Sequence, residues 1–267
     1  MGVDLTGLCA DLRAEGALVL DVLEALGPEQ WRLGTPATGW TIADQVSHLA
    51  YFDDAATLAV TDPERFRVEA DELAARGDDF TEYVAARYRD RTGAELLTWF
   101  AGARDKLLET MAQADPSQKL PWFGPPMSAA GSLTARLMET WAHGLDIRDT
   151  LGLPPVASAR LRHIAHLGYA TVGWSFVVHG RPKPERSLRL ELHGPGGTPW
   201  QWGPEDAADR IRGSALDFCL LVTQRRHRGD LGLDVEGSMA AEYVGLAQIF
   251  AGPPGLGRAP AADATHG

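Results

Sequence analysis

Cysteine is scarce in this chain of 267 residues, which contains only Cys9 and Cys219. Two thiols are too few for a disulfide framework, and a zinc site made of cysteine alone needs four thiolates. Cys219 stands between Phe218 and Leu220, and Cys9 lies in an apolar helical pattern. We interpret both cysteines as structural residues.

Long apolar runs and a basic leader are also missing. No stretch approaches the ~20 apolar residues that span a bilayer. The first residues, MGVDLTGLCADLRAEG, carry acids where a signal peptide needs a basic region followed by an apolar run. The sequence therefore predicts a cytoplasmic protein that does not insert into a membrane.

An excess of basic residues is lacking as well. Lys and Arg number 25 against 36 Asp and Glu, which gives a formal net charge of −11. Binding to duplex nucleic acid or to an anionic membrane requires clustered cations, so neither is an expected partner. Hydrophobic residues make up 45% of the chain, which is enough for a folded core.

Four segments of the first 150 residues repeat apolar side chains at helical spacing. They are 4–26, a segment that begins at a Thr41–Asp44 capping box, a segment that begins at a Thr92–Glu95 capping box, and 132–149. The charged stretch 62–90 is expected to be helical and solvated, and 112–131 to be a loop. Four apolar stripes predict an all-α four-helix bundle over residues 1–155.

The pattern changes to strand-like alternation after about residue 184. Leu188, Leu190 and Leu192 alternate with polar residues, and Trp200 and Trp202 do the same after a Gly-Pro-Gly-Gly turn. Further strands are expected at 210–212 and 231–235, and helices at 158–178, at 214–226 behind a Ser214 cap, and at 238–250 behind a Ser238 cap. We therefore predict a small α+β domain at 156–254 and a disordered tail at 255–267.

One helix carries a spacing suited to metal binding. Glu139 and His143 are four residues apart and share a helix face, and Asp146 falls on the same stripe. His48 lies on another predicted helix of the same bundle, from which it can face this pair. Two histidines and one carboxylate leave open positions on a divalent cation, as in catalytic sites. The alternatives are a solvated Glu–His pair and a histidine buried in the core.

A basic cluster, Arg225, Arg226 and Arg228, stands out in an acidic chain. Cations are favoured at the C-terminal end of a helix by its dipole, which would explain the cluster structurally. The functional alternative is that it binds the carboxylate of a substrate.

The segments that carry these residues resemble a known family. GWTIADQVSHLA (39–50) and METWAHGLD (138–146) are similar to the two metal-ligand helices of DinB/YfiT-like proteins. The resemblance is closest to the actinobacterial branch typified by mycothiol-dependent maleylpyruvate isomerase, which adds a small domain related to sterol carrier proteins. GSALDFCLLVTQR (213–225) looks like a helix of that second domain.

This resemblance implies a set of ligands and a chemistry. It implies zinc bound by His48, Glu139 and His143, and mycothiol or another low-molecular-weight thiol as cosubstrate. It also implies a catalytic role for Arg225, although the family usually has Gly where this chain has Gln224. A zinc-bound thiol ionises at neutral pH and can add to an electrophilic carbon, as an S-transferase or in cis–trans isomerisation.

Two other functions remain open from the sequence. A zinc hydrolase would use metal-bound water in place of a thiol. A non-catalytic carrier would bind a small apolar ligand among Trp200, Trp202 and Phe218 of the second domain. In each case the expected partners are small molecules, and the chain is expected to be a monomer or a homodimer.

Overall fold

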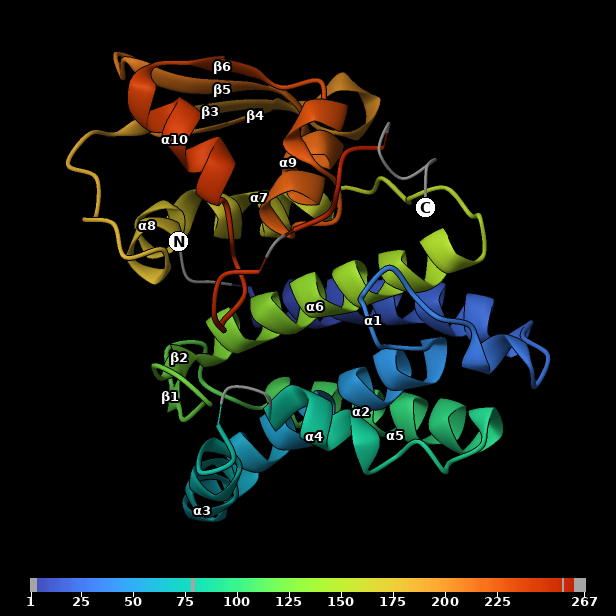
Figure 1. The fold of residues 1–267 in the computed structure, drawn as a ribbon. Helices are drawn as coiled ribbons and strands as arrows, with labels where there is room; N and C mark the ends of the chain where they lie inside the picture. The colour runs from blue at the N-terminus through green and yellow to red at the C-terminus, as the bar shows by residue number, and fades with distance from the viewer. Residues whose placement is uncertain (1–3, 78–79, 256, 262–267) are drawn as a thin grey trace. The chain divides into compact units, whose positions relative to one another are not determined.

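The computed structural model describes residues 4–77, 80–255 and 257–261, and the chain divides into two compact units, Met1–Pro155 and Val156–Gly267. The long helices of the first unit are α1 (Leu5–Glu24), α2 (Ile42–Thr61), α5 (Gly93–Met111) and α6 (Ala129–Thr150). Helix α1 packs against α5 and α6, and α2 packs against the same two helices (Figure 1). This arrangement brings residues of α2 and α6 together across the core of the unit.

Side-chain caps fix where two of these helices begin. Thr41 and Asp44 form a reciprocal capping box at the start of α2, and Thr92 and Glu95 form another at the start of α5. Both capping boxes were predicted from the sequence, and both are confirmed. The apolar faces that follow are buried together, with Ile42, Val46, Leu49, Leu96 and Phe100 in one core cluster.

The segment between α2 and α5 is more buried than the sequence suggested. It contains α3 (Pro63–Ala74) and α4 (Phe80–Ala86), and each has an apolar side. Phe66 of α3 is buried against Trp122 and Phe123, which come from the connection before α6. The prediction of helix is therefore right, but the prediction of a fully solvated segment is wrong.

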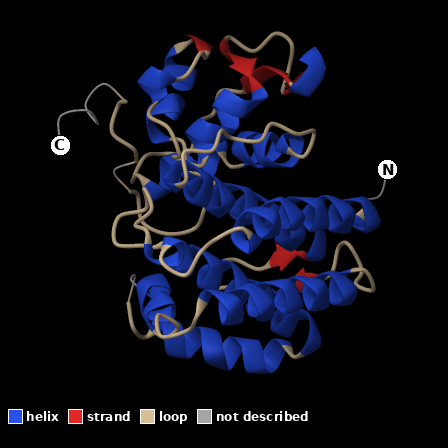
Figure 2. Cartoon of the chain, turned by 90° about the vertical axis from the view of Figure 1, so that its right-hand side faces the viewer, coloured by secondary structure: helices blue, strands red, loops and turns tan. Residues whose placement is uncertain are grey.

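The connection before α6 is also more ordered than the predicted loop at 112–131. It contains the short antiparallel strands β1 (Lys119–Leu120) and β2 (Met127–Ser128), drawn in red near the helices in Figure 2. Ser128 caps α6 through the N–H of Gly131, so the helix begins at Ala129 instead of 132. The 3-10 turn η1 (Gln30–Arg32) completes the first unit.

The second unit contains a four-stranded sheet with the order β4-β3-β5-β6. Its strands are β3 (Leu188–His193), β4 (Pro199–Trp202), β5 (Asp209–Ser214) and β6 (Asp234–Glu236). Strand β3 is antiparallel to β4 and parallel to β5, and β6 is antiparallel to β5. The predicted alternation in β3 is confirmed, because Leu188, Leu190 and Leu192 are all buried. Strand β6 is shorter than the 231–235 alternation suggested.

Four helices and two 3-10 turns complete the described part of this unit: α7 (Leu161–Ala170), α8 (Val172–Val178), α9 (Ala215–Val222), α10 (Ser238–Leu246), η2 (Pro195–Gly197) and η3 (Arg228–Asp230). The single helix predicted at 158–178 is wrong, because the chain breaks at Thr171. The Thr171 hydroxyl donates to the carbonyl of Leu167, a local bond that competes with continued helix. Of the predicted disordered tail, residue 256 and residues 262–267 lie outside the described residues.

Helix α9 ends earlier than predicted, at Val222 instead of Arg226. Gln224 has φ 58°, in the left-handed region, and the N–H groups of Gln224 and Arg225 bond back to the carbonyls of Leu221 and Leu220. This is the double hydrogen-bond pattern of a Schellman ending, which normally places glycine at the left-handed position. The basic cluster therefore follows the helix and does not form its last turn.

Helix α10 is capped by a distant carboxylate and not, as predicted, by Ser238. Gly237 occupies the cap position, and Asp209 at the start of β5 accepts hydrogen bonds from the N–H groups of Met239 (2.8 Å) and Ala240 (3.1 Å). The helix also ends at Leu246, before the predicted 250. A local sequence pattern cannot reveal a cap that comes from 30 residues away.

We expect Asp209→Ala to lower the free energy of unfolding by about 2 kcal/mol, because it removes the cap and leaves two buried N–H groups without an acceptor. Urea denaturation measures the change. The matched control is Ser238→Ala, which should stay within about 0.5 kcal/mol of the parent protein. A larger loss in the serine variant would mean that Ser238 caps the helix after all.

Candidate metal centre

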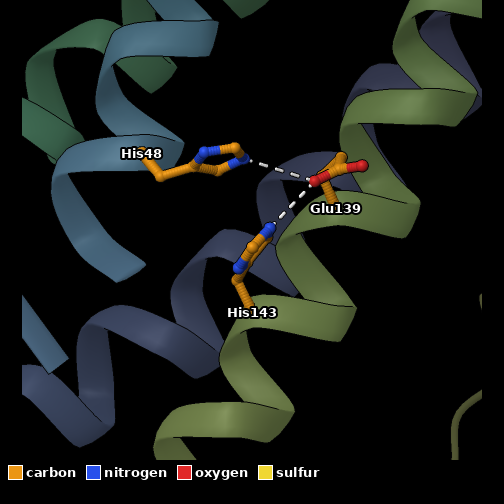
Figure 3. Close-up of side chains that lie close together, drawn as sticks. All are labelled: His48, Glu139 and His143. Atoms are coloured by element: carbon orange, nitrogen blue, oxygen red, sulfur yellow. Dashed lines mark hydrogen bonds and ion pairs between the residues drawn. The ribbon is translucent and has the colours of Figure 1, made fainter. Parts of the chain in front are cut away.

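Three side chains from two helices meet in the first unit. His48 comes from α2, and Glu139 and His143 come from successive turns of α6 (Figure 3). The Nε2 atoms of His48 and His143 lie 3.4 Å and 2.9 Å from the same carboxylate oxygen, Glu139 Oε2. One ligand atom from each residue falls within 4.8 Å of the other two. The structure thus brings together the three residues that the sequence singled out.

The spacing of these atoms fits a metal ion. Ligands of tetrahedral zinc at about 2.0–2.1 Å from the ion lie roughly 3.3–3.4 Å from one another. The 3.4 Å between His48 and Glu139 matches this value, and the 2.9 Å between His143 and Glu139 is slightly shorter. Asp146, which the sequence placed on the same stripe, is buried but lies outside this group.

The second ring nitrogen of His143 has an acceptor of its own. Its Nδ1 lies 2.5 Å from Oε1 of Gln45, a fully buried residue of α2. Gln45 Nε2 donates to the Thr35 hydroxyl at 2.8 Å, and this hydroxyl donates to the Trp40 carbonyl at 2.9 Å. The chain of bonds turns the amide oxygen toward His143, so Nδ1 carries a proton and Nε2 is the ring nitrogen that faces Glu139.

The His143 ring, placed between the oxygens of Gln45 and Glu139, requires a positive charge on the ring or at its Nε2. Acceptors lie at both nitrogens of the His143 ring, so the ring is satisfied either as an imidazolium or with a cation at Nε2 in place of the second proton. Metal-binding histidines commonly donate their other N–H to a fixed acceptor in this way. Gln45 was missed by the sequence analysis, although its place three residues before His48 puts it on the same helix face.

Burial and hydrogen bonds set the charge of the other two groups. Burial, together with the charge of nearby His143, lowers the pKa of His48 to about 4, so its imidazole is neutral at neutral pH. Burial alone would raise the pKa of Glu139, but hydrogen bonds from His143 and His48 hold it well below its usual range. A neutral imidazole beside a carboxylate is the protonation state that a divalent metal requires.

Aromatic rings surround the histidines. The Trp40 ring lies 5.2 Å from His48 and 6.0 Å from His143, and Phe52 lies 4.5 Å from His48. The Trp40 indole N–H donates to Glu82 of α4 at 3.0 Å, which holds the ring in place. Apolar walls of this kind limit access of water to the three polar side chains.

The remaining predicted residues lie in the second unit. Arg225 is half-buried just beyond α9 and donates to the Thr223 carbonyl at 2.8 Å. The left-handed Gln224 before it occupies a position that favours glycine, which matches the Gly-Arg order of the family that the sequence resembles. Trp200 and Phe218, proposed above as pocket walls, are buried, and Phe218 packs on Gly168.

Comparison with known proteins identifies the fold. The chain matches the crystal structure of the mycothiol-dependent maleylpyruvate isomerase with a TM-score of 0.56 and 16% identity, over 87% of this chain and 93% of that one. A histidine-to-alanine mutant of that isomerase matches with a TM-score of 0.58 and 18% identity over the same shares. Among the described residues no helix is long and apolar enough to cross a membrane.

Sequence comparison gives the family. Uncharacterised proteins of two Mycobacterium tuberculosis strains, CDC 1551 / Oshkosh and ATCC 25618 / H37Rv, are each 47% identical over 93% of this chain and 97% of their own length. Residues 189–232 match a family described as wyosine base formation. Residues 12–148, which include His48, Glu139 and His143, match the mycothiol maleylpyruvate isomerase N-terminal domain. This match spans more than half of the chain, and the protein therefore belongs to the mycothiol maleylpyruvate isomerase N-terminal domain family.

Proposed function

We propose that this protein is a metal-dependent, mycothiol-using isomerase or S-transferase. Helices α1, α2, α5 and α6 would form the DinB-like four-helix bundle that holds one divalent ion, zinc, through His48, Glu139 and His143. One observation carries the proposal: two imidazole Nε2 atoms converge on a single carboxylate oxygen within the segment that matches the family. Three protein ligands leave one position for a small molecule, as in catalytic zinc sites.

The chemistry of the proposal is thiol activation. Bound zinc lowers the pKa of a coordinated thiol, so that the thiolate is available at neutral pH. His48 supplies a neutral nitrogen and Glu139 an anionic oxygen, while Gln45 keeps the proton of His143 on Nδ1 and away from Nε2. Trp40 and Phe52 cover the histidine rings with apolar surface, which leaves less room for water to compete with the thiol for the open position.

The substrate in this proposal is a small electrophile that carries a carboxylate. Arg225 would bind the carboxylate, or the enolate that forms when the thiolate adds to the neighbouring carbon, because a guanidinium binds planar oxyanions through two parallel hydrogen bonds. The match to a maleylpyruvate isomerase fold makes maleylpyruvate the first substrate to test.

The deciding experiment measures the conversion of maleylpyruvate to its trans isomer by zinc-loaded protein. We expect turnover only when mycothiol is present, and loss of turnover after a chelator removes the metal. Consumption of thiol together with substrate would identify an S-transferase instead. Isomerisation that needs metal but no thiol would overturn the proposal, and metal-dependent cleavage of the substrate by water would support the hydrolase alternative.

Gln45→Ala should weaken zinc binding by about 10- to 100-fold, because loss of a hydrogen bond to a ligating histidine frees its ring orientation and tautomer. Competition with a chromogenic chelator measures the affinity. Gln45→Glu, which keeps an acceptor at Nδ1, should bind zinc as tightly as the parent protein or more tightly. Unchanged affinity in Gln45→Ala would show that the amide does not position His143.

Arg225→Ala should keep the metal and the fold but lose roughly 10- to 100-fold in rate, which corresponds to about 1.5–3 kcal/mol for a hydrogen bond to a charged group. The matched control is Arg162→Ala, because Arg162 is an exposed cation on α7 of the same unit. Equal losses in the two variants would show that a diffuse positive charge matters and that Arg225 has no individual role.

A further inference from the structure

The second unit contains a cavity that the proposed thiol chemistry does not use. Its volume is about 330 Å³, and it lies between the C-terminal ends of α9 and α10 and the segment that follows α10. The polar and charged residues that line it are His179, Gln224, Arg226, His227, Arg228 and Arg258. Arg225, the arginine of the proposed function, does not line this cavity.

The charged side chains that line this cavity are all basic. Three arginines and two histidines face the cavity, and no Asp or Glu does so among the described residues. This is unusual in a chain with a net charge of −11. The acidic excess lies in residues 1–155, because residues 156–267 carry 12 basic and 11 acidic side chains.

Helix ends explain only part of this charge. The C-terminal ends of α9 and α10 both reach the cavity, and each has a partial charge of roughly −0.5. Together they balance about one cation. Arg226 donates to the carbonyl of Arg225 at 2.7 Å, in the segment just after α9. Arg228 and Arg258 bring further positive charge to the same cavity.

The two histidines are held by their Nδ1 atoms. His179 Nδ1 donates to the Ser175 carbonyl at 2.7 Å, so its Nε2 becomes a donor when the ring is protonated. His227 Nδ1 accepts from the N–H of Gly229 at 3.1 Å, so its Nε2 carries the proton even in the neutral ring. Both rings therefore have Nε2 as the atom left for a further partner.

We infer that this cavity binds a small molecule with two or more negative oxyanion charges, either a phosphate ester or a dicarboxylate. Guanidinium groups bind both kinds of oxyanion through paired, charge-assisted hydrogen bonds. Leu221, Val244 and Ala247 provide an apolar side for the rest of the ligand. The inference does not depend on the metal centre, because every lining residue belongs to the second unit.

Isothermal titration of the full chain with inorganic phosphate, pyrophosphate and succinate tests this inference. We expect at least one of these probes to bind, and Arg228→Ala to weaken that binding by about tenfold or more. The Arg228 side chain is exposed and its guanidinium lies beside Gly245, where an added Cβ would be 3.2 Å away. Gly245→Leu should therefore also weaken binding, by filling the cavity without removing a charge.

The control is Arg162→Ala, which removes the same charge outside the cavity and should leave the dissociation constant within about twofold. Circular dichroism and metal content should not change in any of the three variants. Tighter binding of phosphate probes would assign the ligand as a phosphate ester, and tighter binding of succinate as a dicarboxylate. Absence of binding for all three probes at millimolar concentration, or an equal loss in Arg162→Ala, would overturn the inference.

Discussion

His143→Ala is expected to reduce the metal content from about one ion per chain to nearly none. The remaining ligands, His48 and Glu139, would be two, and a two-ligand set holds zinc poorly compared with the three ligands of catalytic sites. The variant also removes the hydrogen bond between His143 Nδ1 and the amide oxygen of Gln45, which fixes the orientation of the imidazole ring. Elemental analysis after dialysis against a metal buffer measures the content.

The control for this experiment is His166→Ala, because His166 is an exposed histidine of α7 in the second unit. Its metal content should equal that of the parent protein. Unchanged thermal unfolding of the apo forms would separate loss of a ligand from loss of the fold. Full metal content in His143→Ala would mean that the ion binds elsewhere and that the cluster of His48, Glu139 and His143 is a hydrogen-bonded group without metal.

The meeting of His48, Glu139 and His143 could be predicted because part of this cluster is local. Glu139 and His143 are four residues apart, and a helix places such residues on one face whatever surrounds it. His48 could be added because one capping box fixed the start of α2 and thus the face on which the histidine lies. The hydrogen bonds of Gln45 with His143 and Thr35 could not be predicted. A glutamine on a buried helix face can bond to many different groups, and the sequence does not show which of them lies beside it after the helices pack.

Helix ends were predicted well where the cap is local and poorly where it is not. The capping boxes at Thr41 and Thr92 each involve residues three apart in sequence. The cap of α10 comes instead from Asp209, and the end of α9 depends on a left-handed glutamine where the sequence pattern expects glycine. Both errors therefore arose where tertiary contacts or backbone strain outweighed local preference.

A buried ion-pair network was also invisible in the sequence. Asp53 of α2 is fully buried, and it accepts hydrogen bonds from Arg104 of α5 at 2.7 Å and from Arg136 of α6 at 2.9 Å. Arg104 also donates to the Leu12 carbonyl of α1 and to the Thr140 hydroxyl of α6. The partners are 51 and 83 residues from Asp53, so no periodic pattern connects them. The network joins all four long helices of the first unit.

Asp53→Ala should lower the free energy of unfolding by about 3–5 kcal/mol, because it leaves two buried guanidinium groups without their carboxylate. This is a large part of the ~5–15 kcal/mol that stabilises a typical domain. The midpoint of thermal unfolding should fall by roughly 6–20 °C. Metal affinity should fall as well, because the Asp53–Arg136 ion pair joins α2, which carries His48, to α6, which carries the other two proposed ligands.

The neighbouring carboxylate gives a matched control. Asp54 is exposed and accepts one hydrogen bond, from the Trp99 indole at 2.7 Å. Asp54→Ala should cost no more than about 1 kcal/mol, since a solvent-exposed partner is rehydrated when the bond is lost. Similar losses in the two alanine variants would show that the Asp53 network contributes no more than a surface contact.

A triple variant, Asp53→Leu with Arg104→Met and Arg136→Met, separates the cost of breaking the network from its net contribution. Replacing all of the charges removes the desolvation penalty along with the attraction, and such exchanges are often neutral or stabilising by about 1–4 kcal/mol. We therefore expect the triple variant to unfold at a higher temperature than Asp53→Ala. If it also keeps zinc affinity, apolar packing of the four helices is enough to hold His48 against Glu139 and His143. If it is stable but binds zinc weakly, the buried charges fix the register of α2 against α6. Their role would then be to position the three proposed ligands, in spite of the free energy that their desolvation costs.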